Sequence, residues 1–179
     1  MIGSSLIVAC CKGGVGKTVV TANLAKALRR AGHRVAALDV DYRSPDLPYL
    51  FDGLEDPELL QRGSGDSLIP PVSKEGIPVF SLHYFWSPES AVEVKDEEAM
   101  DDVRQILRPG IIDWQQDLDY LVIDTPPDST GTLTVVFEAP NLRGVIIVCQ
   151  PSIPRGRIHK SHRLIVILEC ISFADLLIL

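Results

Sequence analysis

The sequence predicts an α/β fold with a mostly parallel central sheet flanked by helices. Four short runs rich in Val, Ile and Leu lack polar alternation, which is typical of strands buried on both faces of a parallel sheet. These runs are residues 6–10, 35–38, 120–123 and 145–149, with 78–82 as a weaker fifth candidate. A glycine-rich turn and a helical pattern separate the first two runs, so this part of the chain reads as a βαβ unit. Ligands of such open sheets bind beyond the carboxyl ends of the strands.

The first elements follow from local pattern. The opening "MIGSSLIVAC" has no basic segment before its short apolar run, so we interpret it as a first strand rather than a signal peptide. A helix is expected next, with Val20, Leu24, Leu28 and Ala31 at helical spacing and Gly32 as its C-terminal stop.

The remaining elements are less regular. Residues 52–76 are crowded with Gly, Pro and Asp and predict an irregular surface excursion, while Met100, Val103 and Leu107 mark one face of a later helix. Residues 151–179 begin basic and end strongly apolar, which we interpret as a helix on the sheet followed by a final strand. We expect residues 1–179 to form a single domain.

Bulk composition excludes several classes of protein. With 179 residues, 46% of them hydrophobic and 23% charged, the chain reads as one globular domain. A net charge of −7 argues against indiscriminate nucleic-acid binding. No apolar run reaches the roughly 20 residues of a membrane-spanning helix. The four cysteines have no regular spacing and are expected to be reduced, in a cytoplasmic protein.

The stretch "KGGVGKT" between the first strand and the first helix is the main chemical motif. Phosphate binding by a loop needs backbone N–H groups that no Cβ obstructs, and a following helix N-terminus that favours negative charge. Lys17 would reach the β- and γ-phosphate oxygens, and the Thr18 hydroxyl would bind Mg²⁺. The expected nucleotide-binding residues are Gly13, Gly14, Val15, Gly16, Lys17, Thr18 and Val19. A glycine turn without chemistry is the alternative.

Lys12 distinguishes this loop from an ordinary phosphate loop. The form KGGxGK[ST] resembles the deviant Walker A motif of the MinD, ParA and Mrp family of SIMIBI-class P-loop ATPases. The resemblance implies that Lys12 crosses a homodimer interface and touches the nucleotide of the other subunit, where charge develops in the transition state. Lys12 is therefore a candidate catalytic residue beside Lys17, and a solvated loop charge is the other interpretation. Cys11 stands where the ordinary motif has its first glycine.

Carboxylates follow two further strands, as a magnesium–nucleotide site requires. Asp39 and Asp41 follow the expected strand at 35–38, and Asp124 in "DTPPDSTG" follows the expected strand at 120–123. The resemblance implies that Asp41 is catalytic and holds the hydrolytic water, and that Asp39 and Asp124 act on Mg²⁺, mostly through its waters. A strand-end Asp is also a common turn former or cap, and for Asp39 the two interpretations stay balanced. Asp128 is interpreted as a cap.

The run from Asp39 to Phe51, with "LDYLVIDTPP" and "GVIIVCQPS", looks most like the Mrp-type branch, whose members carry and assemble iron–sulfur clusters. Because the family usually continues through further strands after the fifth, the resemblance implies a domain that is shortened at its C-terminus. Those members typically bridge a cluster between subunits through a late CxxC pair, and this sequence has none, so a bound cluster is not expected from the residues themselves. Adjacent residues of a strand point to opposite faces, so Cys10 and Cys11 do not readily share a metal. Cys10 is expected to be buried, and Cys149 and Cys170 to be core or tail residues.

Three functions compete on these observations. The first is a dimerising, Mg²⁺-dependent ATPase that is coupled to iron–sulfur cluster or protein assembly. The second is a positioning switch of MinD or ParA type, in which ATP hydrolysis releases a membrane or DNA; the basic start of the tail keeps it open. The third is a nucleotide-binding module without turnover. A small-molecule kinase has no use for Lys12, and GTP is disfavoured because no NKxD motif is present.

Overall fold

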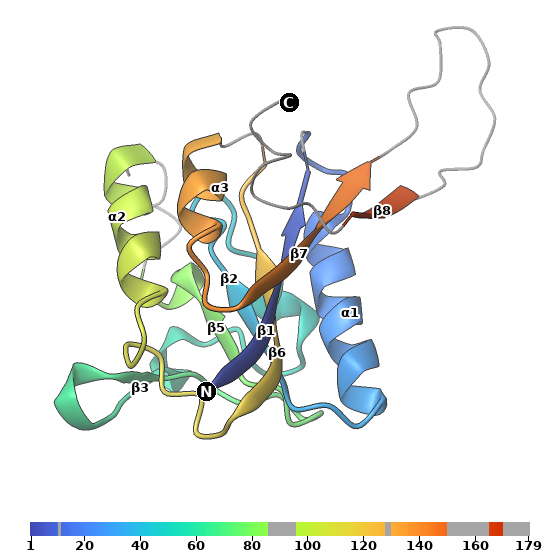
Figure 1. Ribbon diagram of the computed structural model, residues 1–179. Coiled ribbons are helices and arrows are strands. Elements are labelled where there is room, and N and C mark those ends of the chain that lie inside the picture. Colours follow the sequence, from blue (N-terminus) through green and yellow to red (C-terminus); the bar gives the residue numbers. More distant parts are fainter. Residues whose placement is uncertain (11, 86–95, 128–129, 150–164, 170–179) are drawn as a thin grey trace, which may run out of the picture.

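The computed structural model describes residues 1–10, 12–85, 96–127, 130–149 and 165–169. A six-stranded sheet runs through the centre, in the order β5-β2-β6-β1-β7-β8 (Figure 1). The strands are β1 (Ile2–Ala9), β2 (Val35–Asp39), β5 (Val79–Ser81), β6 (Leu118–Asp124), β7 (Leu142–Cys149) and β8 (Ile165–Glu169). All neighbours pair in parallel except β7 and β8, which are antiparallel. The predicted fold class is confirmed, and each of the five expected strands is present.

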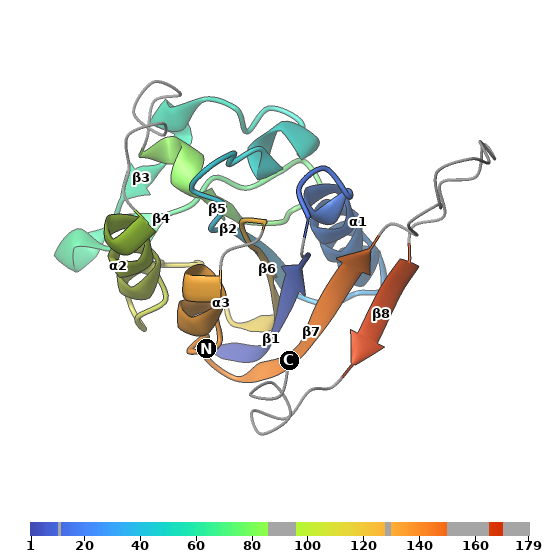
Figure 2. The same ribbon diagram turned by 90° about the horizontal axis from the view of Figure 1, so that it is seen from above.

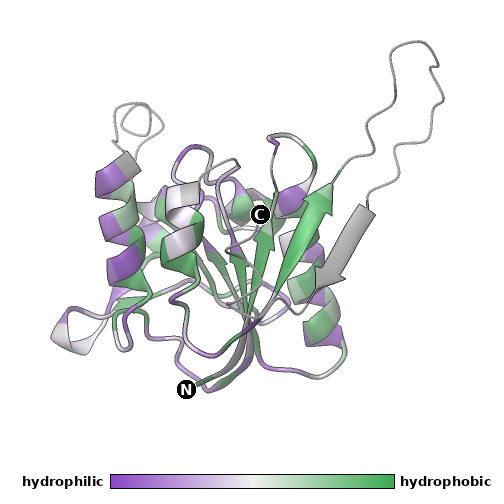
Figure 3. Ribbon diagram, turned by 45° about the horizontal axis from the view of Figure 1, so that its top comes forward, coloured by the Kyte–Doolittle hydropathy of each residue, from purple (hydrophilic) through white to green (hydrophobic). Residues whose placement is uncertain are grey.

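Helices cover both faces of the sheet (Figure 2). Helix α1 (Lys17–Arg30) lies on one face, and α2 (Asp96–Ile106) and α3 (Thr130–Val136) lie on the other. Because successive strand residues point to opposite faces, Ile7 packs with the α2–α3 side and Val8 with the α1 side. The strands are therefore apolar on both faces, and the polar residues of the helices turn outward (Figure 3). This double burial explains why the strand sequences do not alternate.

The most deeply buried apolar residues of helix α1 are small alanines rather than its large side chains. Ala22 and Ala25 are buried against the sheet, while Val20, Leu24 and Leu28 are partly buried beside the same core. Ala31 caps the helix and is exposed, so the expected face ends at Leu28. Gly32 follows with φ of 95°, as a C-terminal stop requires. In α2, Val103 is buried as expected, and Leu107 is buried just beyond the helix end.

The segment 52–76 contains short elements only. It holds the 3₁₀ turns Pro57–Leu59 and Ser64–Asp66 and a small antiparallel hairpin of β3 (Gln61–Arg62) and β4 (Leu68–Ile69). In the tail, β8 is the expected strand, although it pairs antiparallel to β7. The helix expected there, and Cys11, Asp128 and Cys170, lie outside the described residues. In the part of the chain that the structure describes, no helix has the length and apolarity needed to cross a membrane.

Candidate functional site

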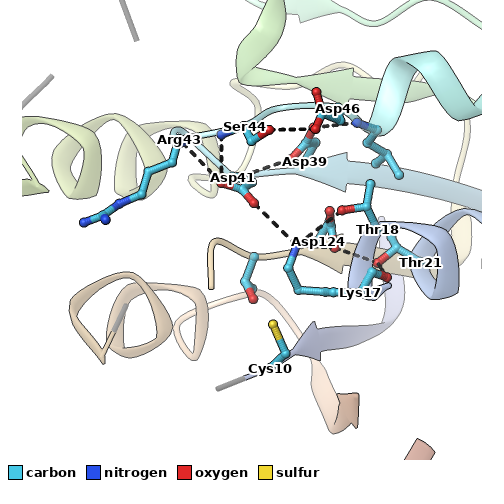
Figure 4. A network of polar contacts seen from close by, with 12 residues as sticks. Cys10, Lys17, Thr18, Thr21, Asp39, Asp41, Arg43, Ser44, Asp46 and Asp124 are labelled. Atoms are coloured by element: carbon cyan, nitrogen blue, oxygen red, sulfur yellow. Dashed lines mark hydrogen bonds and ion pairs between the residues drawn. The ribbon is translucent and has the colours of Figure 1, made fainter. Parts of the chain in front are cut away.

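Three adjacent strands end at one edge of the sheet and bring the predicted residues together. Strand β6 lies between β2 and β1, and Asp39 at the end of β2 is the register partner of Asp124 at the end of β6. The chain leaves β1 at the same edge and turns through the glycine loop into α1. Lys17, the aspartates and two threonines therefore meet in one polar cluster (Figure 4).

The loop before α1 has the backbone shape of a phosphate cradle. Gly14 and Gly16 have φ of 75° and 95°, which favours glycine at both positions. A Cβ placed on Gly14 would meet no atom within 4 Å, so the loop is open on that side. Gly16 precedes the helix and supplies no side-chain cap, and the first turn of α1 carries no acidic residue. The N-terminal N–H groups of α1 are thus directed at a place that suits an anion.

Lys17 is the centre of the cluster. Its Nζ atom is 2.9 Å from Oδ1 of Asp124 and 3.6 Å from Oδ2 of Asp41, and its side chain is only 6% exposed. Burial disfavours the charged amine, but the negative charges of Asp124 and Asp41 outweigh it, so the pKa of Lys17 is raised. The amine is therefore a fixed positive charge inside the protein. Because the amine lies next to the glycine loop, a phosphate oxygen bound there can replace one of its carboxylate partners.

Asp124 has one satisfied and one unsatisfied oxygen. Oδ1 accepts hydrogen bonds from Lys17 Nζ and from Thr21 Oγ1, the latter at 2.8 Å. Oδ2 is buried and has no hydrogen-bond partner among the described residues. Buried carboxylate oxygens are nearly always satisfied, so a lone one marks a place for a water molecule or an ion. Thr21 was not predicted; its spacing of one helical turn from Lys17 is the signal that could have found it.

Asp39 holds the end of β2 and the loop that follows it through hydrogen bonds. It is fully buried; Oδ1 accepts the Asp41 N–H at 3.0 Å, and Oδ2 accepts the Leu47 N–H at 3.1 Å and the Ser81 hydroxyl at 2.9 Å. Burial, followed by the charge of Asp124, raises the pKa of Asp39 well above its usual range. Both oxygens are engaged by protein donors, so Asp39 fixes the path of the backbone at Asp41. Ser81 was not foreseen, because nothing local in the sequence links it to Asp39.

Asp41 points toward Lys17 with one oxygen and holds its own loop with the other. Oδ1 accepts the N–H groups of Arg43 at 3.2 Å and Ser44 at 3.1 Å, while Oδ2 faces Lys17. Burial raises the pKa of Asp41, although Lys17 opposes the shift. A carboxylate with a raised pKa, anchored on one oxygen, is suited to orient water and accept a proton.

The donors in this cluster fit a magnesium ion in part. The unsatisfied Asp124 oxygen and the half-buried Thr18 hydroxyl, 3.5 Å from Lys17 Nζ, are hard oxygen ligands of the kind Mg²⁺ prefers. Within the described residues, no group of three His, Cys, Asp or Glu side chains could hold a metal alone. A magnesium ion here would accordingly need phosphate oxygens and water to complete its ligand set.

The remaining predicted residues lie around the loop. Val15 is buried, whereas Lys12, Gly13 and Val19 are exposed, so Lys12 is accessible to another molecule. Cys10 is buried as expected, and its thiol donates a hydrogen bond to the Lys12 carbonyl at 3.2 Å. Cys149 is half-buried on β7.

Comparisons with known proteins point the same way as the loop. A family model described as ParA, NUBPL iron-transfer P-loop NTPase, matches residues 1–165. An iron–sulfur cluster carrier protein of Methanocaldococcus jannaschii is 35% identical over 153 residues, which are 84% of this chain and 50% of that protein. A cytosolic Fe-S cluster assembly factor Nubp2 homolog of Drosophila ananassae is 34% identical over 150 residues, which are 82% of this chain and 56% of that protein.

A solved structure is similar at the same level. The nucleotide-binding protein of Archaeoglobus fulgidus, in complex with ADP, is 34% identical, with a TM-score of 0.66 over 82% of this chain and 54% of that one. The chain spans about half the length of these relatives. The resemblance to MinD, ParA and Mrp proteins that the loop sequence predicts is confirmed, as is the P-loop architecture.

Proposed function

Because the chain belongs to the family of ParA-like, iron-transfer P-loop NTPases, we propose that it binds and hydrolyses ATP with Mg²⁺ as a nucleotide-dependent homodimer. The hydrolysis would serve the assembly of an iron–sulfur cluster or of a client protein. The observation that carries this proposal is the buried Lys17 amine, held between Asp124 and Asp41 directly beside the glycine loop.

Nucleotide binding begins with an exchange of anions around Lys17. The β- and γ-phosphate oxygens enter the loop and accept hydrogen bonds from the backbone N–H groups of residues 13–19. They also replace the carboxylates as the partners of Lys17 Nζ. Asp124 keeps its hydrogen bond from Thr21 and is then available to the metal side of the site. The Archaeoglobus fulgidus protein, 54% of whose chain matches this one, was solved in complex with ADP, and this supports nucleotide binding by the present chain.

Thr18, Asp39 and Asp124 are the residues we propose for Mg²⁺. The ion would neutralise charge on the phosphates when it is bound. Thr18 and Asp124 would act through their oxygen atoms or through water. Asp39, whose oxygens already take protein hydrogen bonds, would act by holding Asp41 and the strand end in place.

Asp41 is the proposed residue for the attacking water. The water oxygen would form a bond to the γ-phosphorus, the bond from that phosphorus to the ADP oxygen would break, and the proton of the water would pass to the Asp41 carboxylate or to the released phosphate. The raised pKa of Asp41 favours proton acceptance, and its fixed Oδ1 limits it to one orientation. Lys17 stabilises the charge that develops on the phosphate oxygens.

Phosphate release tests the hydrolytic assignment. Asp41→Ala should reduce the steady-state rate by at least about a hundredfold, in the range that removal of a catalytic base produces, while ATP binding persists. Asp52→Ala removes an exposed carboxylate from the same half of the chain and should leave the rate unchanged. An unchanged rate in Asp41→Ala would show that Asp41 is not the hydrolytic residue.

Lys12 tests the dimer part of the proposal. Lys12 is exposed at the loop, so a second subunit can approach it. We expect Lys12→Ala to bind ATP normally and to lose the rise of specific activity with protein concentration. Lys74→Ala, a change to another exposed lysine, is the matched control. Specific activity that is independent of protein concentration in the unaltered protein would contradict the proposal.

The cargo is the most distant part of the proposal. The names of the relatives support iron–sulfur cluster assembly, but the two described cysteines, Cys10 just after β1 and Cys149 at the end of β7, belong to no metal-binding group among the described residues. Iron absorbance of anaerobically purified protein is the direct test. A cluster-type absorbance that survives gel filtration would support cluster carriage by this chain, and its absence would leave assembly of a client as the proposed role.

A further inference from the structure

A mostly apolar hollow lies at the opposite end of the sheet from the phosphate loop. It has a volume of about 320 Å³ and lies between the end of α2, the loop that follows it and the start of β1. Its walls include Ile2, Leu107, Ile112, Trp114, Leu121 and Pro140. Nothing in the nucleotide mechanism uses these residues. The volume is within the range of small-molecule sites, which are mostly apolar with a few polar groups.

The walls are well ordered by packing. Leu107 and Ile112 are 9% and 8% exposed, and Leu121, in the middle of β6, is 2% exposed. The main chain of the loop is also held, because the Ile111 N–H donates to the Arg108 carbonyl and the Asp113 N–H donates to the Leu68 carbonyl. A hollow that persists in such surroundings presents a fixed apolar shape, and its apolar area favours a hydrocarbon occupant.

Arg108 is the charged side chain in the lining of the hollow, which also includes the polar Asn141. It is exposed, it lines the hollow, and no carboxylate among the described residues pairs with it. Arg104, nearby on α2, is different, because it pairs with Asp101 at 2.9 Å. In a protein of net charge −7, a guanidinium that pairs with none of the described carboxylates and belongs to the lining of an apolar hollow is complementary to a ligand with one anionic end.

We propose that this hollow binds a small amphipathic carboxylate, with its hydrocarbon chain among the apolar walls and its carboxylate on Arg108. A volume of about 320 Å³ is at the small end of ligand sites, which run from about 300 to 1,000 Å³. A free medium-chain carboxylate such as octanoate, with ten non-hydrogen atoms, matches this size. The site is independent of the nucleotide-binding proposal, so either can fail without the other.

Trp114 gives the experiment its readout. With Trp86 replaced by Phe, Trp114 is the one tryptophan left in the sequence, and it lines the hollow. Octanoate added to this variant should change the Trp114 emission saturably. The affinity should rise about fourfold per methylene from hexanoate to octanoate, as burial of a CH₂ group predicts, and should level off once the hollow is full.

Three variants separate the two halves of the site. Arg108→Gln should weaken octanoate binding roughly tenfold and leave 1-octanol binding unchanged, and it alters no core packing. Arg30→Gln changes an exposed arginine on the helix of the other face and should alter neither. Ile112→Phe should block both ligands, with near-ultraviolet circular dichroism as the check of folding.

Two results would overturn the proposal. One is the absence of a saturable change in Trp114 emission with millimolar octanoate. The other is octanoate binding that Arg108→Gln leaves unaffected. If emission changes with protein concentration and not with octanoate, a second copy of the chain occupies the hollow, and the proposal of a carboxylate ligand is wrong.

Discussion

Strand β6 carries an ion-paired aspartate near each of its ends, and the two pairs have opposite characters. Near its start, Asp119 lies 2.9 Å from Arg34, and the two side chains are 37% and 49% exposed. At its end, Asp124 lies 2.9 Å from Lys17, and the two side chains are 1% and 6% exposed. The distance is the same, but the access of water is very different.

The difference shows what each pair can do. Water screens the exposed pair, so its contribution to stability is small and it serves to join β6 to the loop before β2. The buried pair has lost its hydration, so the Lys17 charge depends on Asp124 and Asp41, and the Asp124 charge depends on Lys17 and Thr21. A phosphate group can compete with the two aspartates for Lys17, because the buried amine cannot exchange either partner for water. The buried end is therefore the end that suits anion exchange.

The largest effect should come from breaking the buried pair. Asp124→Ala removes the acceptor of both Lys17 Nζ and Thr21 Oγ1 and leaves the buried Lys17 cation with Asp41 alone, at 3.6 Å. Breaking a buried ion pair in this way typically costs about 3–5 kcal/mol of unfolding free energy. Urea denaturation of the nucleotide-free protein at pH 7 measures it, and the loss should persist in 1 M salt. A loss no greater than that of Asp119→Ala would contradict the distinction between the two ends of β6.

A smaller effect should follow from the threonine that supports the buried end. Thr21→Val keeps the volume of the side chain and removes the hydrogen bond to Asp124, which leaves a buried acceptor less satisfied at a cost of about 1–3 kcal/mol. Thr21→Ser retains the hydroxyl and is the matched control. Equal denaturation midpoints for the valine and serine variants would show that the hydrogen bond contributes nothing.

The smallest effect is expected at the exposed end. Asp119 accepts hydrogen bonds from the Arg34 side chain and from the Arg34 backbone N–H, and these lower the pKa of Asp119 from 3.8 to about 2. A carboxylate with a lowered folded-state pKa stabilises the protein above its unfolded-state pKa and loses that effect as the pH falls through the folded value. Asp119→Asn should therefore differ slightly from the unaltered protein above about pH 4 and converge with it near pH 2. Added salt should shrink the difference, and a salt-independent difference would contradict the assignment.

Local sequence pattern was sufficient for most of the fold. Unbroken apolar runs located β2 and β6 to within two residues, because strands buried on both faces cannot alternate. The glycine spacing and Lys17 located the loop, because a phosphate cradle constrains backbone and charge together. Asp39, Asp41 and Asp124 followed from the rule that parallel strands present their ends at one edge.

Contacts between distant residues were beyond the reach of the same reasoning. Thr21 and Asp124 are 103 positions apart, and Ser81 and Asp39 are 42 apart, so no periodicity links them. The antiparallel pairing of β8 depends on which sheet edge is open, which sequence pattern does not report. The hollow beside Trp114 depends on how α2 ends over the sheet, and this too is a tertiary property.

The central claim is that the buried end of β6 is a nucleotide site, and titration calorimetry with ATP and Mg²⁺ tests it most directly. The unaltered protein should bind one nucleotide per chain, Lys17→Ala should lose measurable binding while circular dichroism shows it folded, and Arg34→Ala should bind as the unaltered protein does. Undiminished ATP affinity in folded Lys17→Ala would contradict the account.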